Sequence, residues 1–255
     1  MIPLELKRDK DGLLYASDED IVKRPSLLID HRPVNEYRYD QCGFYSFDST
    51  DEYIIKYYYN RVIRRTRKLT KQMLINLITR QKNIPDVDFP IGYFKEKYYL
   101  AGLIIKYYKT GISLDNICKD KSLSLLSKYY YHDEDDIHNV FLLFYELLDI
   151  IYEMFENGVY YNDIHPGNIV IFDNKIKIID FDPYRVRFDN KDERLSNIMN
   201  NYCLFMKIVL KEFNLVDKFG DMYNNFQEAK VFTKKLENSI RKNRWWWDYG
   251  TQITI

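Results

Sequence analysis

Residues 159–182 read VYYNDIHPGNIVIFDNKIKIIDFD and form the most informative stretch of the 255-residue chain. The pair Asp173-Asn174 lies between two apolar runs, residues 169–172 and 176–179. A polar two-residue turn between apolar runs of this length is typical of a β-hairpin. The sequence therefore predicts two antiparallel strands joined by this turn.

Three polar side chains flank the predicted hairpin. Antiparallel pairing places Asn168, at the start of the first strand, beside Asp180, at the end of the second. An amide oxygen and a carboxylate suit a hard cation such as Mg²⁺, which prefers oxygen ligands. Asp163 lies on the loop before Asn168, together with Pro166 and Gly167, and can act there as a base. The plainer interpretation, a polar loop before an ordinary hairpin, explains fewer of these positions.

The order and spacing of these residues resemble the protein-kinase-like superfamily. Residues 163–168, DIHPGN, and 179–181, IDF, are similar to the catalytic loop H-R-D-L-x-x-x-N and the metal-binding D-F-G of protein kinases. The resemblance implies an α+β, bilobal protein-kinase-like fold with a small β-rich N-lobe and a mainly helical C-lobe. It also implies ATP and Mg²⁺ as ligands, Asp163 as the catalytic residue, and Asn168 and Asp180 as metal ligands.

The same stretch also resembles small-molecule kinases. Tyr161 and Asn162 stand where protein kinases have His-Arg, and His165 stands where they have Lys. The loop looks more like the D-L-H-P-G-N of aminoglycoside phosphotransferases. Asp182 replaces the Gly of D-F-G, as in choline kinases and lipopolysaccharide sugar kinases. Two roles stay open for each residue: His165 contacts the transferred phosphate or bonds its own loop, and Asp182 assists a second metal or caps a turn.

The sequence before the hairpin can also be compared with protein kinases. It has a matching lysine but lacks the usual glutamate and the glycine-rich loop. Lys56 ends an Ile-Ile-Lys strand and resembles the lysine that contacts ATP phosphates, although a solvated strand lysine is the simpler alternative. In protein kinases the next helix supplies a Glu to this lysine, but residues 53–95 contain no Glu. Gln72 is the best-placed polar substitute. Residues 13–91 contain a single glycine, so the glycine-rich phosphate loop is also missing.

Composition and charge limit the classes of partner and location that are expected for this protein. The 38 Lys and Arg balance the 38 Asp and Glu, so no overall charge draws the chain to nucleic acid. Basic residues within 61–82 are interpreted as a solvated helix face rather than a partner surface. A membrane span needs about 18 consecutive apolar residues, and no such run is present. Three widely spaced cysteines and the absence of a signal-peptide hydrophobic region indicate a cytoplasmic location. The oligomeric state is left open.

Hydrophobic periodicity predicts the order of the elements. An irregular or partly extended lead-in is expected over residues 1–35, the N-lobe over 36–108 and the C-lobe over 109–255. In the N-lobe we expect strands at 36–39, 43–47 and 53–58, a helix at 64–82 and a hairpin at 94–108; in the C-lobe we expect helices at 137–156, 192–213 and 222–242.

Together these features favour an ATP- and Mg²⁺-dependent phosphotransferase that moves the γ-phosphate to a hydroxyl acceptor, with protein Ser/Thr slightly preferred. A small-molecule or sugar kinase is a close alternative, because the next predicted helix begins soon after Asp180, at Asp192, and leaves no room for a long activation loop. The third hypothesis is a pseudokinase that acts as a binding module. The missing Glu and glycine loop support it, and the retained Asp163, Asn168 and Asp180 oppose it.

Overall fold

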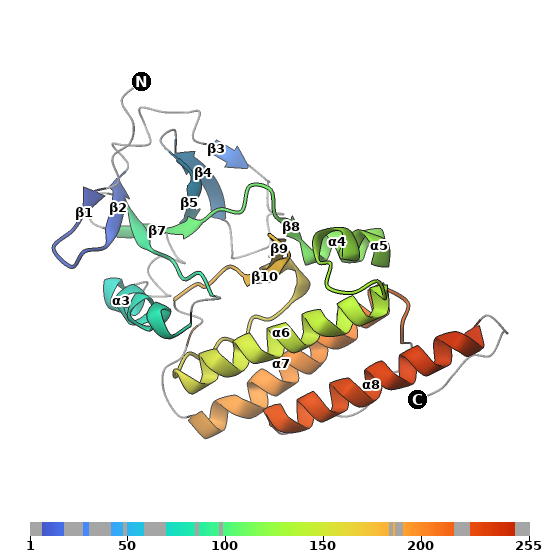
Figure 1. The fold of residues 1–255 in the computed structure, drawn as a ribbon. Helices are drawn as coiled ribbons and strands as arrows, with labels where there is room; N and C mark the ends of the chain where they lie inside the picture. The colour runs from blue at the N-terminus through green and yellow to red at the C-terminus, as the bar shows by residue number, and fades with distance from the viewer. Residues whose placement is uncertain are drawn as a thin grey trace, which may run out of the picture. The chain divides into compact units, whose positions relative to one another are not determined.

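The chain divides into two compact units in the computed structural model. The first, here called the sheet unit, comprises Met1–Lys109 and Phe181–Tyr184, and the second, the helical unit, comprises Thr110–Asp180 and Arg185–Ile255 (Figure 1). The residues that the structure describes are 7–17, 28–30, 42–47, 50–58, 70–84, 87–96, 99–183, 186, 191–216 and 225–247.

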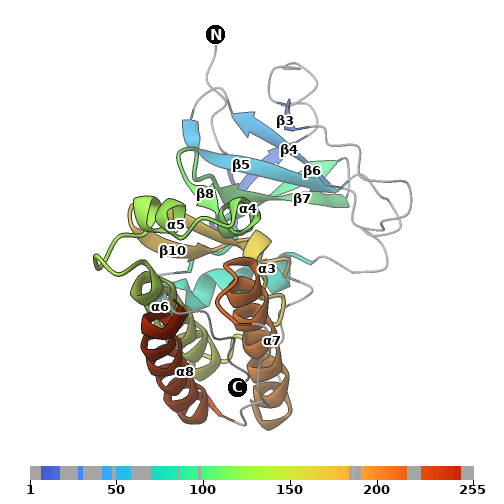
Figure 2. The same ribbon diagram turned by 90° about the vertical axis from the view of Figure 1, so that its right-hand side faces the viewer.

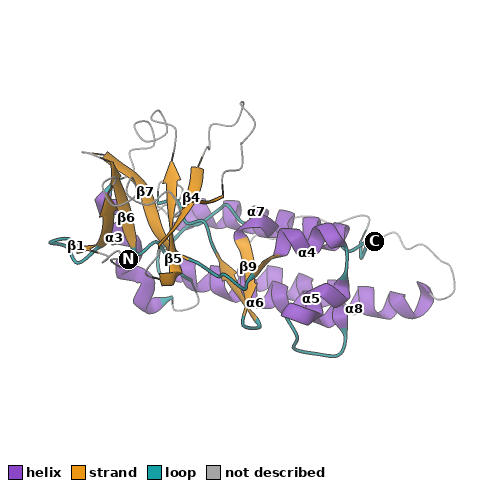
Figure 3. Ribbon diagram, turned by 90° about the horizontal axis from the view of Figure 1, so that it is seen from above, coloured by secondary structure: helices purple, strands orange, loops and turns teal. Residues whose placement is uncertain are grey.

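A seven-stranded sheet forms the body of the sheet unit. Its strands follow the order β1-β2-β6-β7-β5-β4-β3, and all neighbours are antiparallel except β2 and β6. Figure 3 shows this sheet from above, with β4, β5, β6 and β7 labelled. The long strand β5 therefore lies inside the sheet, between β4 and β7. The strands are β1 Lys7–Arg8, β2 Leu14–Ser17, β3 Leu28–Asp30, β4 Cys42–Phe47, β5 Thr50–Tyr58, β6 Gly92–Glu96 and β7 Tyr99–Lys106.

The strand predictions for this unit are mostly confirmed. β4 and β5 cover the predicted strands at 43–47 and 53–58. β6 and β7 form the hairpin expected at 94–108, and the observed hairpin begins at Gly92. The strand expected at 36–39 lies outside the described residues. Within the lead-in, which was expected to be irregular or partly extended, the short strands β1 and β2 join the sheet, and β2 pairs parallel to β6. Strands this short carry no visible alternation of their own.

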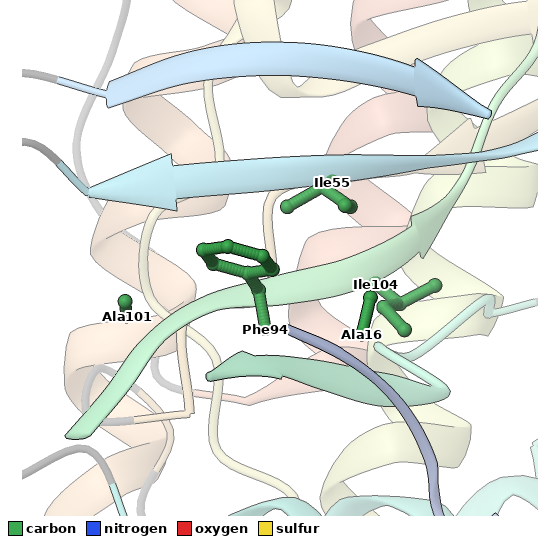
Figure 4. Packing of buried hydrophobic residues seen from close by; sticks show 5 residues of the cluster. All are labelled: Ala16, Ile55, Phe94, Ala101 and Ile104. Carbon is green, nitrogen blue, oxygen red and sulfur yellow. The ribbon is translucent and has the colours of Figure 1, made fainter. Parts of the chain in front are cut away.

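Apolar side chains cover both faces of the sheet. On one face Ile55, Phe94 and Ile104 pack with Ala16 and Ala101 (Figure 4). On the other face Leu13, Tyr58 and Leu103 pack with Leu74 of helix α3, Lys71–Arg80, which a short 3₁₀ turn, Gln81–Asn83, follows. The hydroxyl of Thr70 caps α3 by accepting a hydrogen bond from the Met73 amide. The helix predicted at 64–82 is thus confirmed from residue 71, and residues 64–69 lie outside the described part.

Three long helices form the core of the helical unit. Helices α6, Asp136–Glu156, α7, Lys191–Glu212, and α8, Phe226–Trp247, lie side by side (Figures 1 and 2). They confirm the three helices predicted from periodicity. A short sheet has the order β10-β9-β8. The remaining elements are β8 Ile112–Ser113, α4 Leu114–Asp120, α5 Leu123–Tyr129, the 3₁₀ turn η3 Pro166–Asn168, β9 Ile169–Phe172 and β10 Lys175–Ile178.

Local signals set both ends of α6. The Asp135 carboxylate accepts hydrogen bonds from the backbone amides of Ile137 and His138, which satisfies donors that the first helical turn leaves unpaired. At the other end Asn157 caps the helix and Gly158 takes a positive φ of 71°. Twelve α6 residues are buried, so the helix is the centre of the core that supports the hairpin. None of the helices in the described ranges is long and apolar enough to cross a membrane.

Candidate active site

The hairpin predicted from residues 169–179 is present in the helical unit. β9 and β10 pair with Phe172 opposite Lys175, so Asp173 and Asn174 form a two-residue turn. Both turn residues have positive φ, 49° and 61°, which is the requirement of a type I′ turn. Glu146 of α6 accepts a hydrogen bond from the Ile176 amide at 3.3 Å and thereby fastens the hairpin to the core.

The amide of Asn168 is held in one orientation. The Ile179 backbone amide donates to the backbone carbonyl of Asn168 at 2.8 Å. Asn168 therefore lies where the second strand ends, as expected. Asn168 is buried, and its Nδ2 donates to the Asp163 carbonyl at 2.8 Å and to the Tyr161 hydroxyl at 3.0 Å. Both bonds use the nitrogen. The oxygen Oδ1 therefore points the other way and is the atom that can bind a cation.

Tyr161 links Asn168 to the backbone next to Asp180. Its ring is buried, and its hydroxyl lies 3.4 Å from the Ile179 carbonyl and 3.5 Å from the Asp180 carbonyl. Since the hydroxyl accepts from Asn168, its own proton is directed to these carbonyls. Sequence reasoning did not include Tyr161 in the site. The available signal was its position, where protein kinases have the His of H-R-D.

Asp180 has an uncommon backbone conformation. Its φ is +67°, in the left-handed region that few residues other than glycine adopt. Asp and Asn tolerate this region better than most side chains, and such conformations are concentrated at functional sites. The conformation turns the chain sharply directly after β10.

Asp163 and His165 lie on the loop before η3. The Asp163 carbonyl is held by Asn168, and the Asp163 side chain is half-buried. The His165 side chain is exposed, and its Nδ1 accepts a hydrogen bond from the Gly167 amide at 3.1 Å. Of the two roles left open for His165, the structure shows the bond within its own loop. This bond gives Nδ1 the acceptor role and leaves the proton on Nε2.

A second polar cluster lies within the sheet unit. Lys56 is buried on β5, and its Nζ lies 2.8 Å from Oδ1 of Asp182. The Tyr58 hydroxyl donates to the same oxygen. Gln72, the substitute expected for the missing Glu, is exposed and donates to Asn76 at 3.2 Å. The structure therefore brings Lys56 to Asp182 rather than to Gln72, and sequence reasoning did not include Tyr58.

The residues of the helical unit fit Mg²⁺. This ion keeps several waters and uses one or two protein carboxylates together with substrate phosphates, instead of a cage made by the protein alone. Asn168 and Asp180 offer one amide oxygen and one carboxylate. Within the described ranges no group of three or more His, Cys, Asp and Glu side chains forms such a cage. One amide oxygen and one carboxylate are groups of the kind that Mg²⁺ uses together with the phosphates of a substrate.

Comparison with known proteins identifies the fold. No protein-family model and no curated protein matches the sequence. Among solved structures, the chain is similar to the crystal structure of the BubR1 kinase domain, with a TM-score of 0.50 and 11% sequence identity over 85% of both chains. The chain therefore has a kinase-like fold, with a β-sheet N-terminal region and a helical C-terminal part. This confirms the predicted fold class, and at 11% identity the likeness concerns the fold alone.

Proposed function

We propose that this chain is an ATP- and Mg²⁺-dependent phosphotransferase that moves the γ-phosphate of ATP to a hydroxyl acceptor. The observation that carries the proposal is the bonded arrangement around Asn168. Its amide nitrogen holds the Asp163 loop and the Tyr161 hydroxyl, and Tyr161 lies against the Asp180 backbone. Asp163, Asn168 and Asp180, which the proposed chemistry requires, thus belong to one hydrogen-bonded framework. A polar loop without a function would not require such a framework.

The proposed roles follow from the chemistry of each group. Asp163 orients the acceptor hydroxyl and accepts its proton. Asn168 Oδ1 and the Asp180 carboxylate would hold the metal, which would supply positive charge that stabilises the phosphoryl group during transfer. The ammonium of Lys56 contacts the α- and β-phosphates. Phosphoryl transfer depends mostly on positioning and charge stabilisation, so these four residues are sufficient if they are held in place.

The acceptor is proposed with two candidates. A protein Ser/Thr hydroxyl ranks first, as the commoner acceptor among proteins with this fold. The length of one segment favours the second candidate, a small molecule or sugar. Only residues 181–190 separate Asp180 from the start of α7 at Lys191. Such a segment is too short to form the long platform on which protein kinases bind a peptide.

Metal-dependent nucleotide binding tests the proposal. We expect ATP with Mg²⁺ to raise the melting temperature of the wild-type protein, because a ligand that binds only the folded state stabilises it. Asp180→Ala removes a metal ligand and is expected to abolish most of this shift. Lys177→Ala, on β10 three residues before Asp180, is the control and should keep it. A wild-type protein without any Mg²⁺-dependent ATP binding would contradict the proposal.

Product analysis separates the acceptor classes and the pseudokinase alternative. Intact-mass measurement after incubation with ATP and Mg²⁺ detects phosphate on the protein itself, and candidate small hydroxyl compounds can be assayed in the same mixture. Phosphorylated protein favours the first acceptor class. A phosphorylated small molecule favours the second. Binding of ATP with no transfer to any acceptor, water included, would identify a nucleotide-binding module instead of an enzyme.

A further inference from the structure

Lys56 has a carboxylate partner in an unexpected part of the chain. Lys56 and Asp182 are 126 residues apart in the sequence, yet Nζ and Oδ1 are separated by 2.8 Å. Their side chains are only 6% and 3% exposed. Charged groups are rarely buried to this extent unless they are paired, since the loss of hydration must be offset by a close opposite charge. The ion pair is therefore a fixed part of the sheet unit.

Tyr58 makes this a cluster of three side chains. Tyr58 and Lys56 are two residues apart on β5, so their side chains lie on the same face of the sheet. The Tyr58 hydroxyl donates to Oδ1 of Asp182, and Lys56 Nζ lies 5.4 Å from the centre of the Tyr58 ring. The carboxylate oxygen is thus bound by an ammonium and a hydroxyl. An oxygen with two such donors is better suited to fix a lysine than to bind a second metal.

The segment that carries Asp182 is anchored on the sheet unit. Phe181 is buried, and its ring packs edge-on against Phe89 with the ring centres 5.0 Å apart. Pro183, which follows Asp182, is also buried and has its own φ fixed by its ring. Two residues of fully extended chain span at most about 7 Å. The Lys56 partner is therefore held next to Asp180, the proposed metal ligand, by covalent connection alone.

Helix α3 offers no alternative partner. Its ten residues, KQMLINLITR, include no acid, and its amide Gln72 is bonded to Asn76. A helix without a carboxylate cannot set the position of a buried ammonium through an ion pair. The group that fixes Lys56 is instead part of the segment that follows the metal ligand.

From these contacts we propose that Asp182, supported by Tyr58, is the positioning residue that directs Lys56 toward the phosphates of ATP. This inference rests on the proposed phosphotransferase function. It gives Asp182 a role different from the two suggested by sequence, namely a second metal ligand or a turn cap. It also implies that the segment directly after Asp180 positions Lys56, so that α3 is not required for this.

Asp182→Asn is the direct test, because it keeps the shape of the side chain and removes the charge. Loss of alignment is expected to lower kcat for ATP turnover about 10- to 100-fold, since misplacement of a catalytic group by about 1 Å has effects of this size. The KM for ATP should rise little, because the lost carboxylate also repelled the phosphates. A partly unfolded preparation would also lower apparent kcat at unchanged KM, so kcat is calculated per molecule of protein that binds ATP, and the double-mutant cycle below tests the positioning role itself.

The sheet unit contains a matched control. Asp9 accepts from Lys71 at 2.5 Å and from the Tyr93 hydroxyl at 3.0 Å, and Lys71 Nζ lies 5.7 Å from the Tyr93 ring centre. This second Asp–Lys–Tyr cluster also includes Asp11, which lies 2.5 Å from Lys71. Asp9→Asn makes the same chemical change as Asp182→Asn and should leave kcat unchanged.

A double-mutant cycle identifies the residue through which Asp182 acts. If Asp182 works by holding Lys56, then Asp182→Asn should cause no further loss of kcat in a Lys56→Met background. Multiplicative losses in the double variant would overturn the inference. So would a wild-type kcat for Asp182→Asn. Tyr58→Phe keeps the ion pair and removes one hydrogen bond, so a smaller loss of kcat is expected, and it serves as the test if Asp182→Asn does not fold.

The same measurements distinguish the two levels of the proposal. If wild-type protein turns over ATP and Asp182→Asn does so equally well, the positioning role is wrong and the phosphotransferase function stands. If the wild-type protein neither binds nor turns over ATP, the proposed function is wrong and the role of Asp182 falls with it.

Discussion

The hydroxyl of Tyr161 accepts a hydrogen bond from Nδ2 of Asn168 at 3.0 Å. This contact fixes which way the Asn168 amide faces. Without it, the amide nitrogen would be held only by the Asp163 carbonyl, at 2.8 Å. A single hydroxyl group thus helps to determine that an oxygen, and not a nitrogen, is presented to the proposed metal.

Tyr161→Phe removes this hydroxyl and keeps the ring. We expect a loss of stability of about 1 kcal/mol, the usual net contribution of one hydrogen bond. We also expect kcat to fall about tenfold, because the metal ligand Asn168 becomes less well oriented. Thermal unfolding and ATP turnover measure the two effects. Tyr160→Phe is the control, since Tyr160 is buried against Phe155 and has no role in the framework. Equal kcat for wild type and Tyr161→Phe would contradict the assigned orientation.

The environment of the Glu237 carboxylate leads to a prediction of how the stability of the protein depends on pH. It is fully buried on α8 and accepts hydrogen bonds from His138, Tyr145 and Lys234, and Arg241 lies 3.5 Å away. Burial alone would raise the pKa of Glu237, but the hydrogen bonds from Lys234, His138 and Tyr145 outweigh burial and hold the pKa below its ordinary value of 4.5. A carboxylate with a lowered folded-state pKa stabilises the protein above its unfolded-state pKa. That contribution is lost as the pH falls below 4.5 and through the folded-state value.

Glu237→Gln tests this expectation. At pH 7 it should lower the free energy of unfolding by about 1.5–3 kcal/mol, the range for hydrogen bonds to charged groups. The difference between wild type and Glu237→Gln should shrink as the pH falls below 4.5. Urea unfolding over a pH series measures it, and Glu228→Gln, exposed in the first turn of the same helix, is the control. A difference that stays constant with pH would show that the charge of Glu237 does not matter.

Strand β5 at Lys56 leaves no space for a side chain at Gly102 on the neighbouring strand. A Cβ at this position would lie 2.4 Å from the Lys56 carbonyl oxygen, on the neighbouring strand. Gly102→Ala should therefore shift strands β5 and β7 apart and cost about 1–3 kcal/mol. Gly158 is a useful comparison, because it has open space but a φ of +71°. Gly158→Ala should cost about 1–2 kcal/mol through backbone strain alone. If Gly102→Ala is the milder of the two, the close approach of these strands is wrong.

Local features of the sequence were sufficient to predict much of the fold. The two-residue turn at Asp173-Asn174 and the helix at 137–156 depend on neighbouring residues, so the pattern of side chains alone predicted them. β1 and β2 were missed because strands of two and four residues gain their order from pairing with distant parts of the chain.

The site shows the same limit. The spacing of Asp163, Asn168 and Asp180 was visible in the sequence, because these residues surround one hairpin. The partner of Lys56 was not visible, since Asp182 is 126 residues away and no periodic pattern connects them. Tyr161 was overlooked for a different reason: a tyrosine before a polar loop is equally compatible with the core, and only its hydroxyl contacts reveal its part in the framework.

The central claim, that this chain transfers phosphate from ATP, is tested most directly with Asp163→Asn. The change removes the base and retains the Asp163 backbone carbonyl that holds Asn168. With γ-labelled ATP and Mg²⁺, the account predicts that wild-type protein transfers label to an acceptor or to water. Asp163→Asn should bind ATP with nearly wild-type affinity and transfer label at least about 100-fold more slowly, the scale of general-base catalysis. Equal transfer by both proteins, or none by the wild type, would contradict it.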